Sequence, residues 1–178
     1  MARQSTPEDQ REAFRIQERV ALHAVVTNNT EKPAAAHFPE FEQLHTLTEF
    51  TRLGLELQAL IGSLESSVAH ALRLQDKRLD LLANALAAEH TTSKQQTVSI
   101  STNGLAFEQA DALPLNTCLA LAITFVASHF TLFNYAKVVR CDAKGTGWLI
   151  GCEFLEQADS DQQLLGRHII SAQRRSRS

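Results

Sequence analysis

The sequence is poor in the residues that stabilise secreted, membrane-spanning or metal-binding domains. Only three cysteines occur in 178 residues (Cys118, Cys141 and Cys152), and none stands at a spacing typical of metal ligands. An odd number of cysteines inside apolar segments indicates buried free thiols and a reducing compartment. The longest apolar run, 118–127, is far shorter than the roughly 20 residues that cross a bilayer. The N-terminal segment also lacks the apolar core of a secretory signal. We therefore expect a cytoplasmic protein without membrane insertion.

The residue sets that carry out hydrolysis or phosphoryl transfer are also missing. The seven histidines include no pair four residues apart, of the kind that binds zinc from one helix face. The sequence contains no nucleophile elbow and no phosphate-binding P-loop, and the single GTG at 145–147 is typical of a hairpin turn. We predict a non-enzymatic protein with no catalytic residues, no metal and no cofactor.

Charge is close to balanced but unevenly distributed. The 17 Lys and Arg against 20 Asp and Glu give a formal charge of −3, which excludes binding to nucleic acid polymers through bulk charge. The two ends of the chain are nevertheless rich in arginine: Arg3, Arg11, Arg15 and Arg19, and Arg167, Arg174, Arg175 and Arg177. If the fold brings these ends together, they would attract an anion. The alternative is solvated tails, and we expect residues 1–9 and 174–178 to be flexible.

The hydrophobic period changes along the chain, and the first change separates a strand from a long helical segment. Residues 14–26 alternate with period two, which predicts a half-buried strand. Residues 39–90 contain no proline after Pro39 and repeat apolar residues in steps of three and four. Because glycine is costly inside a helix, we divide this segment at Gly62–Ser63 and predict helices over about 40–62 and 64–90.

The second predicted helix carries a heptad pattern that favours self-association. One stripe follows alternating a and d positions, and leucines continue on a second face. The residues of this seam are Val68, Leu72, Gln75, Leu79, Leu82 and Leu86. A homo-oligomer through this seam is our expectation, and the alternative is a helical hairpin packed on its own domain. The heptad alone determines neither the number of helices nor their orientation.

After Thr97 the period returns to two. The strand-like segments are 98–100, 105–107, 119–125, 131–135, 138–141 and 148–154, with turn residues between most of them. Short antiparallel strands of this kind predict a barrel or sandwich. A last amphipathic segment, about 159–173, is predicted to be a helix laid on that sheet. The fold class is therefore α+β, an antiparallel β-domain interrupted by two long helices and closed by a C-terminal helix.

Two short motifs relate this pattern to a known family. Arg11 and Arg15 form an RxxxR stretch before the first strand, and Ser99, Ser101 and Gly104 form SxSxxG at a later strand end. With VVRC at 138–141, WLIGCEF at 148–154 and the last helix, the chain resembles a PilZ domain, a receptor module for cyclic di-GMP. The resemblance covers about 10–30 and 96–175 as one discontinuous domain. It implies a six-stranded barrel interrupted by the helical segment 39–90.

The resemblance implies a nucleotide site and also indicates a weakness in it. Arg11, Arg15, Ser99, Ser101 and Gly104 would contact cyclic di-GMP, since arginine can fork onto phosphate and stack on guanine. The family has Asp or Asn where this chain has Ser99. Losing that charge-assisted hydrogen bond costs roughly 1.5–3 kcal/mol, or tenfold or more in affinity. Weak binding is expected.

The helical segment also resembles an atypical, tetrameric branch of the family. In that branch two long helices interrupt the domain and one of them forms a parallel four-stranded coiled coil, which LRLQDKRLDLLANAL at 72–86 resembles. We therefore expect a cytoplasmic signalling adaptor that assembles as a homotetramer and acts on an unidentified protein partner. The alternative is a constitutive oligomeric scaffold with a vestigial nucleotide site.

Overall fold

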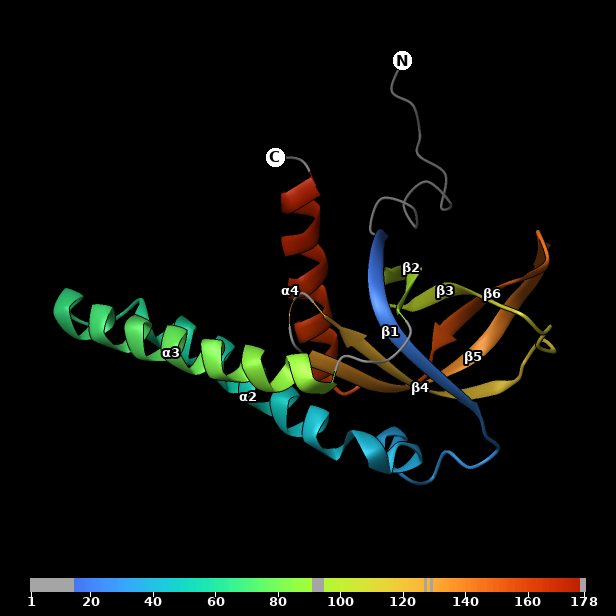
Figure 1. The fold of residues 1–178 in the computed structure, drawn as a ribbon, viewed down its shortest axis with the longest axis horizontal. Coiled ribbons are helices and arrows are strands. Elements are labelled where there is room, and N and C mark those ends of the chain that lie inside the picture. Colours follow the sequence, from blue (N-terminus) through green and yellow to red (C-terminus); the bar gives the residue numbers. More distant parts are fainter. Residues whose placement is uncertain (1–14, 91–94, 127, 129, 177–178) are drawn as a thin grey trace, which may run out of the picture.

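The computed structural model describes residues 15–90, 95–126, 128 and 130–176. Six strands alternate with a helical insertion and end in one helix (Figure 1). The strands are β1 (Ile16–Val26), β2 (Gln95–Ser101), β3 (Gly104–Gln109), β4 (Cys118–Phe125), β5 (Phe130–Lys144) and β6 (Gly147–Phe154). The helices are α2 (Glu42–Ile61), α3 (Ser66–His90) and α4 (Asp159–Ser176), preceded by 3-10 turns at Ala34–His37 and Pro39–Phe41.

The strands close into an antiparallel barrel in the order β1-β2-β3-β6-β5-β4. This confirms the predicted six-stranded α+β fold with its helices inserted between the first and second strands. Because side chains alternate across a strand, every second residue points into the barrel. Val20, Ile100, Leu121, Phe125 and Ile150 are completely buried there. The barrel therefore buries its own apolar residues without help from another chain.

Strand β5 corrects one detail of the sequence interpretation. The segments 131–135 and 138–141 were predicted as separate strands, but they belong to the single strand β5. Its register with β6 shifts between Val138 and Arg140, so Val139 is an extra residue in the ladder. Such a β-bulge interrupts the alternation of side chains without ending the strand. The interruption imitates a strand boundary in the sequence.

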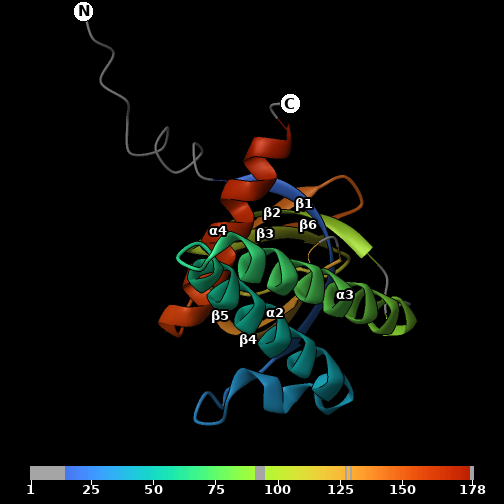
Figure 2. The same ribbon diagram turned by 90° about the vertical axis from the view of Figure 1, so that its left-hand side faces the viewer.

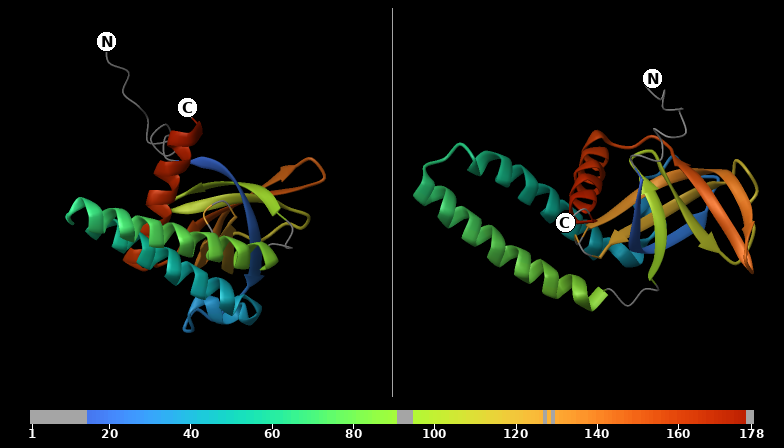
Figure 3. Two further views of the ribbon diagram at one scale, coloured as in Figure 1. Left: turned by 60° about the vertical axis from the view of Figure 1, so that its left-hand side comes forward. Right: turned by 90° about the horizontal axis from the view of Figure 1, so that it is seen from above.

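The insertion is an antiparallel helical hairpin that projects from the barrel (Figure 3, right). Helix α2 ends at Ile61 with Gly62 as its C-cap, close to the predicted joint. Gly54 lies inside α2, where an added Cβ would stand 3.6 Å from Oδ1 of Asp76 on α3. The Asp76 carboxylate is buried and accepts a hydrogen bond of 3.1 Å from the Gln58 amide. That distance is an ordinary contact, so a small side chain would also fit at position 54, and the Gln58–Asp76 hydrogen bond joins the two helices beside it.

Helix α4 lies against the barrel beside β1 (Figure 2). Leu164, Leu165 and Ile169 join the barrel core. The helix continues to Ser176, about three residues beyond the predicted end near 173. The flexibility expected for 1–9 and 174–178 stays a prediction, and residues 1–9, 177 and 178 lie outside the described part. Among the described residues no helix is long and apolar enough to cross a membrane.

Candidate ligand-binding site and assembly surface

The structure brings most of the predicted nucleotide residues to one end of β1, β2 and β3. Ser99 pairs with Gln17 of β1 and with Ala106 of β3. Ser101 and Gly104 form the first pair of the tight β2–β3 hairpin. Arg15 is exposed and immediately precedes the pair Ile16–Ile100, so it stands beside this hairpin. Arg11 lies outside the described residues.

Ser101 and Gly104 have structural roles that need no ligand. Ser101 is buried, and its hydroxyl donates to the Gly104 carbonyl at 3.2 Å and accepts from the Asn103 amide at 3.4 Å. A Cβ at position 104 would collide with the carbonyl oxygen of Cys152 on β6, so only glycine fits. These two motif residues therefore shape the turn, while Ser99 and Arg15 remain at the surface.

A row of outward-facing residues crosses the barrel through Ser99. Successive strand pairs join Gln17, Ser99, Ala106, Gly151 and Arg140 on β1, β2, β3, β6 and β5. The three central residues, which we call the small-residue row (Ser99, Ala106 and Gly151), carry no side chain longer than a hydroxymethyl group. Ser99 is half-buried and Ala106 and Gly151 are buried, and a polar or cationic residue, Gln17 or Arg140, stands at each end of the row. The sequence interpretation missed Gln17, Ala106, Gly151 and Arg140, because only strand pairing places them in one row.

Further arginines lie around the same end of the barrel. The start of β1, with exposed Arg15 and Arg19, and the end of α4, with Arg174 and Arg175, lie on one side of the barrel (Figures 1 and 2). Arg175 also donates a hydrogen bond of 3.2 Å to Ser171 Oγ. The described parts of the two basic ends therefore lie on the same side of the barrel, which is the arrangement under which we expected them to attract an anion.

Beneath this end, α4 carries a buried histidine. His168 is 6% exposed, and its Nδ1 lies 2.9 Å from Ser128 Oγ. Its Nε2 lies 3.5 Å from a Glu18 carboxylate oxygen, and the rings of Phe125 and Phe130 pack around it. Burial lowers the pKa of His168 from its ordinary value near 6.5, which the Glu18 charge partly opposes and the Arg175 charge reinforces. The imidazole is therefore neutral near pH 7.

The predicted seam of α3 is a solvent-exposed surface within one chain. Val68 is 47% exposed, Leu79 37% and Leu82 64%; Gln75 is also exposed, Leu72 is half-buried, and the Leu86 side chain lies outside the described part. Helix α3 instead packs on α2 through Ala69 and Asp76, which are buried. The seam is thus free to contact another molecule.

Leucines of α2 extend this surface. Leu53 and Leu60 are 62% and 65% exposed and directly precede Gly54 and Ile61, the residues that face α3. In α3, Val68 and Gln75 likewise precede Ala69 and Asp76. Successive residues of a helix are rotated by about 100° around its axis. Because α2 and α3 run antiparallel, the residue before each contact residue points to the same side of the hairpin in both helices. The two helices therefore share one apolar face, which we call the hairpin face (Leu53, Leu60, Val68, Leu72, Gln75, Leu79 and Leu82).

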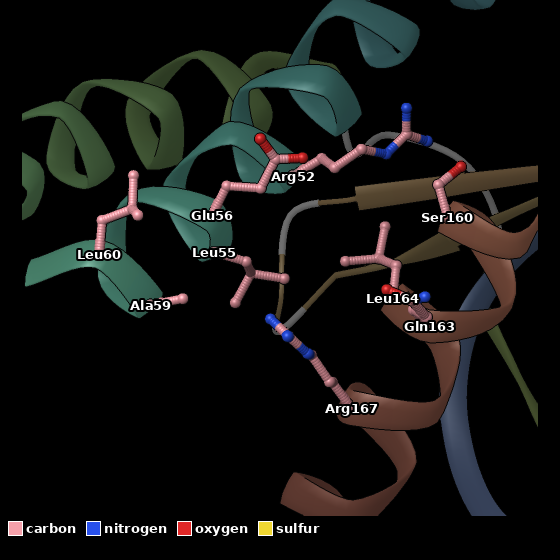
Figure 4. Close-up of a pocket in the computed structure, with 9 residues that line it drawn as sticks. All are labelled: Arg52, Leu55, Glu56, Ala59, Leu60, Ser160, Gln163, Leu164 and Arg167. Atoms are coloured by element: carbon pink, nitrogen blue, oxygen red, sulfur yellow. The ribbon is translucent and has the colours of Figure 1, made fainter. Parts of the chain in front are cut away.

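A cleft of about 340 Å³ separates α2 from α4 (Figure 4). Leu55 and Leu164 line its floor, and the Arg167 side chain points toward Leu55. At its edge Arg52 bridges Glu49 of its own helix and Asp161 of α4, at 2.5 and 2.6 Å. These partners neutralise Arg52, so the cleft offers little net positive charge for a nucleotide. The Arg52–Asp161 ion pair at its edge links the helical insertion to α4, which packs on the barrel.

Neither a metal centre nor a reactive thiol stands out in the part of the chain that the structure describes. There, no three His, Cys, Asp or Glu side chains are grouped to hold a metal ion. Burial raises the pKa of the Cys152 thiol to about 12 and also raises that of Cys118. Both thiols therefore stay protonated and poorly nucleophilic near neutral pH.

Comparison with known proteins identifies the family. The family model of the PilZ domain matches residues 74–171, which are 98 of the 178 residues. The chain therefore belongs to the PilZ domain family, the family of cyclic di-GMP receptors. No curated protein sequence matches the chain.

Two solved structures extend the comparison. A PilZ domain protein of Xanthomonas campestris, described as tetrameric and self-assembled via an unusual helical bundle, is similar with a TM-score of 0.58 and 18% identity. The alignment covers 92% of this chain and 88% of that one. The inhibitor of motility of Bacillus subtilis aligns over 44% of this chain and 42% of its own, with 28% identity and a TM-score of 0.37. The Xanthomonas similarity supports the barrel with a helical insertion as the fold.

Proposed function

We propose that this chain is a non-enzymatic PilZ-type signalling adaptor that assembles as a homotetramer through its helical hairpin and binds cyclic di-GMP weakly. The observation that carries the assembly is the hairpin face, on which Leu53, Leu60 and Leu82 are each more than 60% exposed. Soluble proteins rarely expose a contiguous apolar patch of this extent unless a partner covers it. The tetrameric Xanthomonas protein with its helical bundle favours copies of the same chain as that partner.

Weak nucleotide binding follows from what remains of the motif. Arg15 is exposed beside the β2–β3 hairpin, and Arg19 is exposed further along the same strand. Both guanidiniums can bind phosphate. Ser99 offers a neutral hydroxyl at the position where a carboxylate would bind a guanine edge or an arginine. The Ser101 hydroxyl is already hydrogen-bonded to Gly104 and Asn103 inside the turn. A tetramer would carry four copies of each weak binding surface. A partner that contacts several copies at once would bind with avidity, that is, more tightly than it binds one copy.

Light scattering and titration calorimetry on the full chain test the two halves of this proposal separately. We expect a mass of four chains with and without cyclic di-GMP, and measurable heat at micromolar to high micromolar nucleotide. Arg15→Ala should reduce the heat, because it removes a phosphate-binding cation. A monomeric mass would contradict the assembly, and absent heat or an unaffected Arg15→Ala variant would contradict the nucleotide site.

A constitutive scaffold with a vestigial site is the second candidate function. It is favoured because Ser101 and Gly104 are explained by the hairpin and by packing on Cys152. Ser99→Asp distinguishes the two candidates, since it restores the missing carboxylate. If the adaptor is correct, the variant should bind cyclic di-GMP about tenfold more tightly, as one charge-assisted hydrogen bond allows. Thr97→Asp, on the same face of β2, is the matched control and should leave affinity unchanged. No gain in Ser99→Asp would favour the scaffold.

A further inference from the structure

One polar residue interrupts the hairpin face. Six of its seven members are apolar, and the seventh, Gln75, is exposed on α3. Val68, Gln75 and Leu82 stand seven residues apart, so they occupy the same position in successive heptads. Along the helix they follow one another at intervals of roughly 10 Å. The Gln75 amide therefore lies between apolar side chains, on the surface that we expect a second copy to cover.

The next residue along α3 fixes the direction in which Gln75 points. Asp76 is 7% exposed, and its carboxylate accepts a hydrogen bond of 3.1 Å from the Gln58 amide on α2. This contact holds the rotation of α3 about its axis, so Gln75, about 100° away, points out of the hairpin. Its Oε1 lies 3.5 Å from Nη1 of Arg78, a distance at which a hydrogen bond is weak. The Gln75 side chain, with two N–H donors and a carbonyl acceptor, is therefore available to another chain.

An amide in this place distinguishes between alternative assemblies. When another copy covers the hairpin face, an amide that lies against leucines loses its hydrogen bonds to water and gains none in return. If the Gln75 residues of different copies meet at one level, each amide can donate to one neighbour and accept from another. A closed symmetric assembly satisfies all of them in this way. A shift of the helices by one heptad would place every Gln75 against an apolar residue instead.

We propose that Gln75 determines the register and the number of chains in the assembly through hydrogen bonds between the Gln75 amides of different copies; this inference rests on the assembly half of the proposed function. The apolar residues of the hairpin face supply the attraction between copies, but apolar contact is not directional and tolerates slippage. A hydrogen bond is directional, so a single polar layer selects one arrangement among several of similar apolar area, and the assembly is less stable than it would be with leucine there.

Variants of the full chain at position 75 test this inference by light scattering and by dissociation on dilution. Gln75→Leu should dissociate at about tenfold lower concentration than the unmodified chain, because an apolar residue replaces a buried amide, and should give a mixture of masses. Gln75→Asn keeps an amide and should give a single mass. Lys77→Leu is the matched control, since it adds the same leucine to α3 at an exposed position on the other side of Asp76. It should also keep a single mass.

Oxidative cross-linking tests directly whether the Gln75 residues meet. A disulfide forms only between cysteines whose Cα atoms come within about 7 Å of each other. Gln75→Cys should therefore form disulfides between copies on mild oxidation. Lys77→Cys, on the other side of Asp76, should cross-link no more than the unmodified chain, which carries its own three cysteines.

The outcomes separate this inference from the proposed function. If the unmodified chain is monomeric, the proposed assembly and this inference fail together. If the unmodified chain is tetrameric but Gln75→Leu keeps a single mass of four chains, or Gln75→Cys does not cross-link, Gln75 does not select the arrangement, while the assembly stands. The inference is also wrong if Lys77→Leu gives the same mixture as Gln75→Leu, or if Gln75→Leu dissociates more readily than the unmodified chain.

Discussion

The barrel and the helical hairpin differ in how far one chain buries their apolar side chains. Inside the barrel Leu121, Phe125 and Ile150 are fully buried by the strands of the same chain. On the hairpin, Leu60 and Leu82 are 65% and 64% exposed although α2 and α3 already pack together. A closed sheet can bury one whole face of every strand, whereas two helices bury only the stripe between them. The barrel therefore buries its apolar residues within one chain, whereas the hairpin leaves a face of leucines exposed within one chain.

The largest expected effect comes from placing a charge on the hairpin face. Leu82→Asp would put one carboxylate per chain into a helical interface, where an unpaired buried charge is not tolerated. We expect light scattering to fall from the mass of four chains to that of one, with the β-rich circular dichroism unchanged. Leu115→Asp is the matched control, because Leu115 is 59% exposed on the barrel, and it should leave the mass unaltered. An unchanged mass for Leu82→Asp would show that the seam is not the assembly surface.

A smaller effect, on the free energy of unfolding, is expected from a substitution that creates a cavity in the barrel core. Leu121→Ala should lower the free energy of unfolding by about 2–5 kcal/mol, because it removes a fully buried side chain from a closed core. Trp148, the only tryptophan, lies on β6 and reports urea unfolding of the barrel. Leu60→Ala, the same change on the hairpin face, should shift this transition much less. Equal losses would mean that barrel and hairpin unfold as one unit.

The smallest expected effect, on the pH dependence of stability, concerns the buried histidine of α4, His168. Because burial lowers the folded pKa of His168, the unfolded chain binds more protons as the pH falls through about 6.5. The free energy of unfolding should therefore decrease between pH 7.5 and 5.5. His168→Gln should flatten this dependence, whereas His70→Gln, on an exposed part of α3, should not. Glu18 opposes the effect by attracting the protonated form, and Arg175 adds to it. An equally steep pH profile in His168→Gln would contradict this assignment.

The sequence predicted the elements well where the period was regular. The alternating residues after Thr97 became strands of a closed barrel, and the break at Gly62 separates α2 from α3. It failed at Val139, where one extra residue imitates a strand boundary, and α4 extends to Ser176 although its end was predicted near residue 173. Both failures arise because a local pattern does not show which neighbours the backbone will bond to.

The candidate site was predictable only in part. Arg15 and Ser99 could be identified because the motif is local in the chain. Arg140 and Gly151 could not, since their place beside Ser99 depends on the register of β3, β6 and β5 and on the bulge. Ser101 and Gly104 were singled out from the motif, but their part in the turn and in packing on β6 became visible only with hydrogen bonds and backbone distances.

The linear order of residues alone determined where strands give way to helices and that α3 carries a stripe of leucines, because hydrophobic period is a property of the chain itself. Tertiary structure decided which residues share a surface. It brought Gln17, Ser99 and Arg140 into one row and turned the leucines of α2 and α3 to one side, since strand register and helix rotation are set by packing between segments distant along the chain.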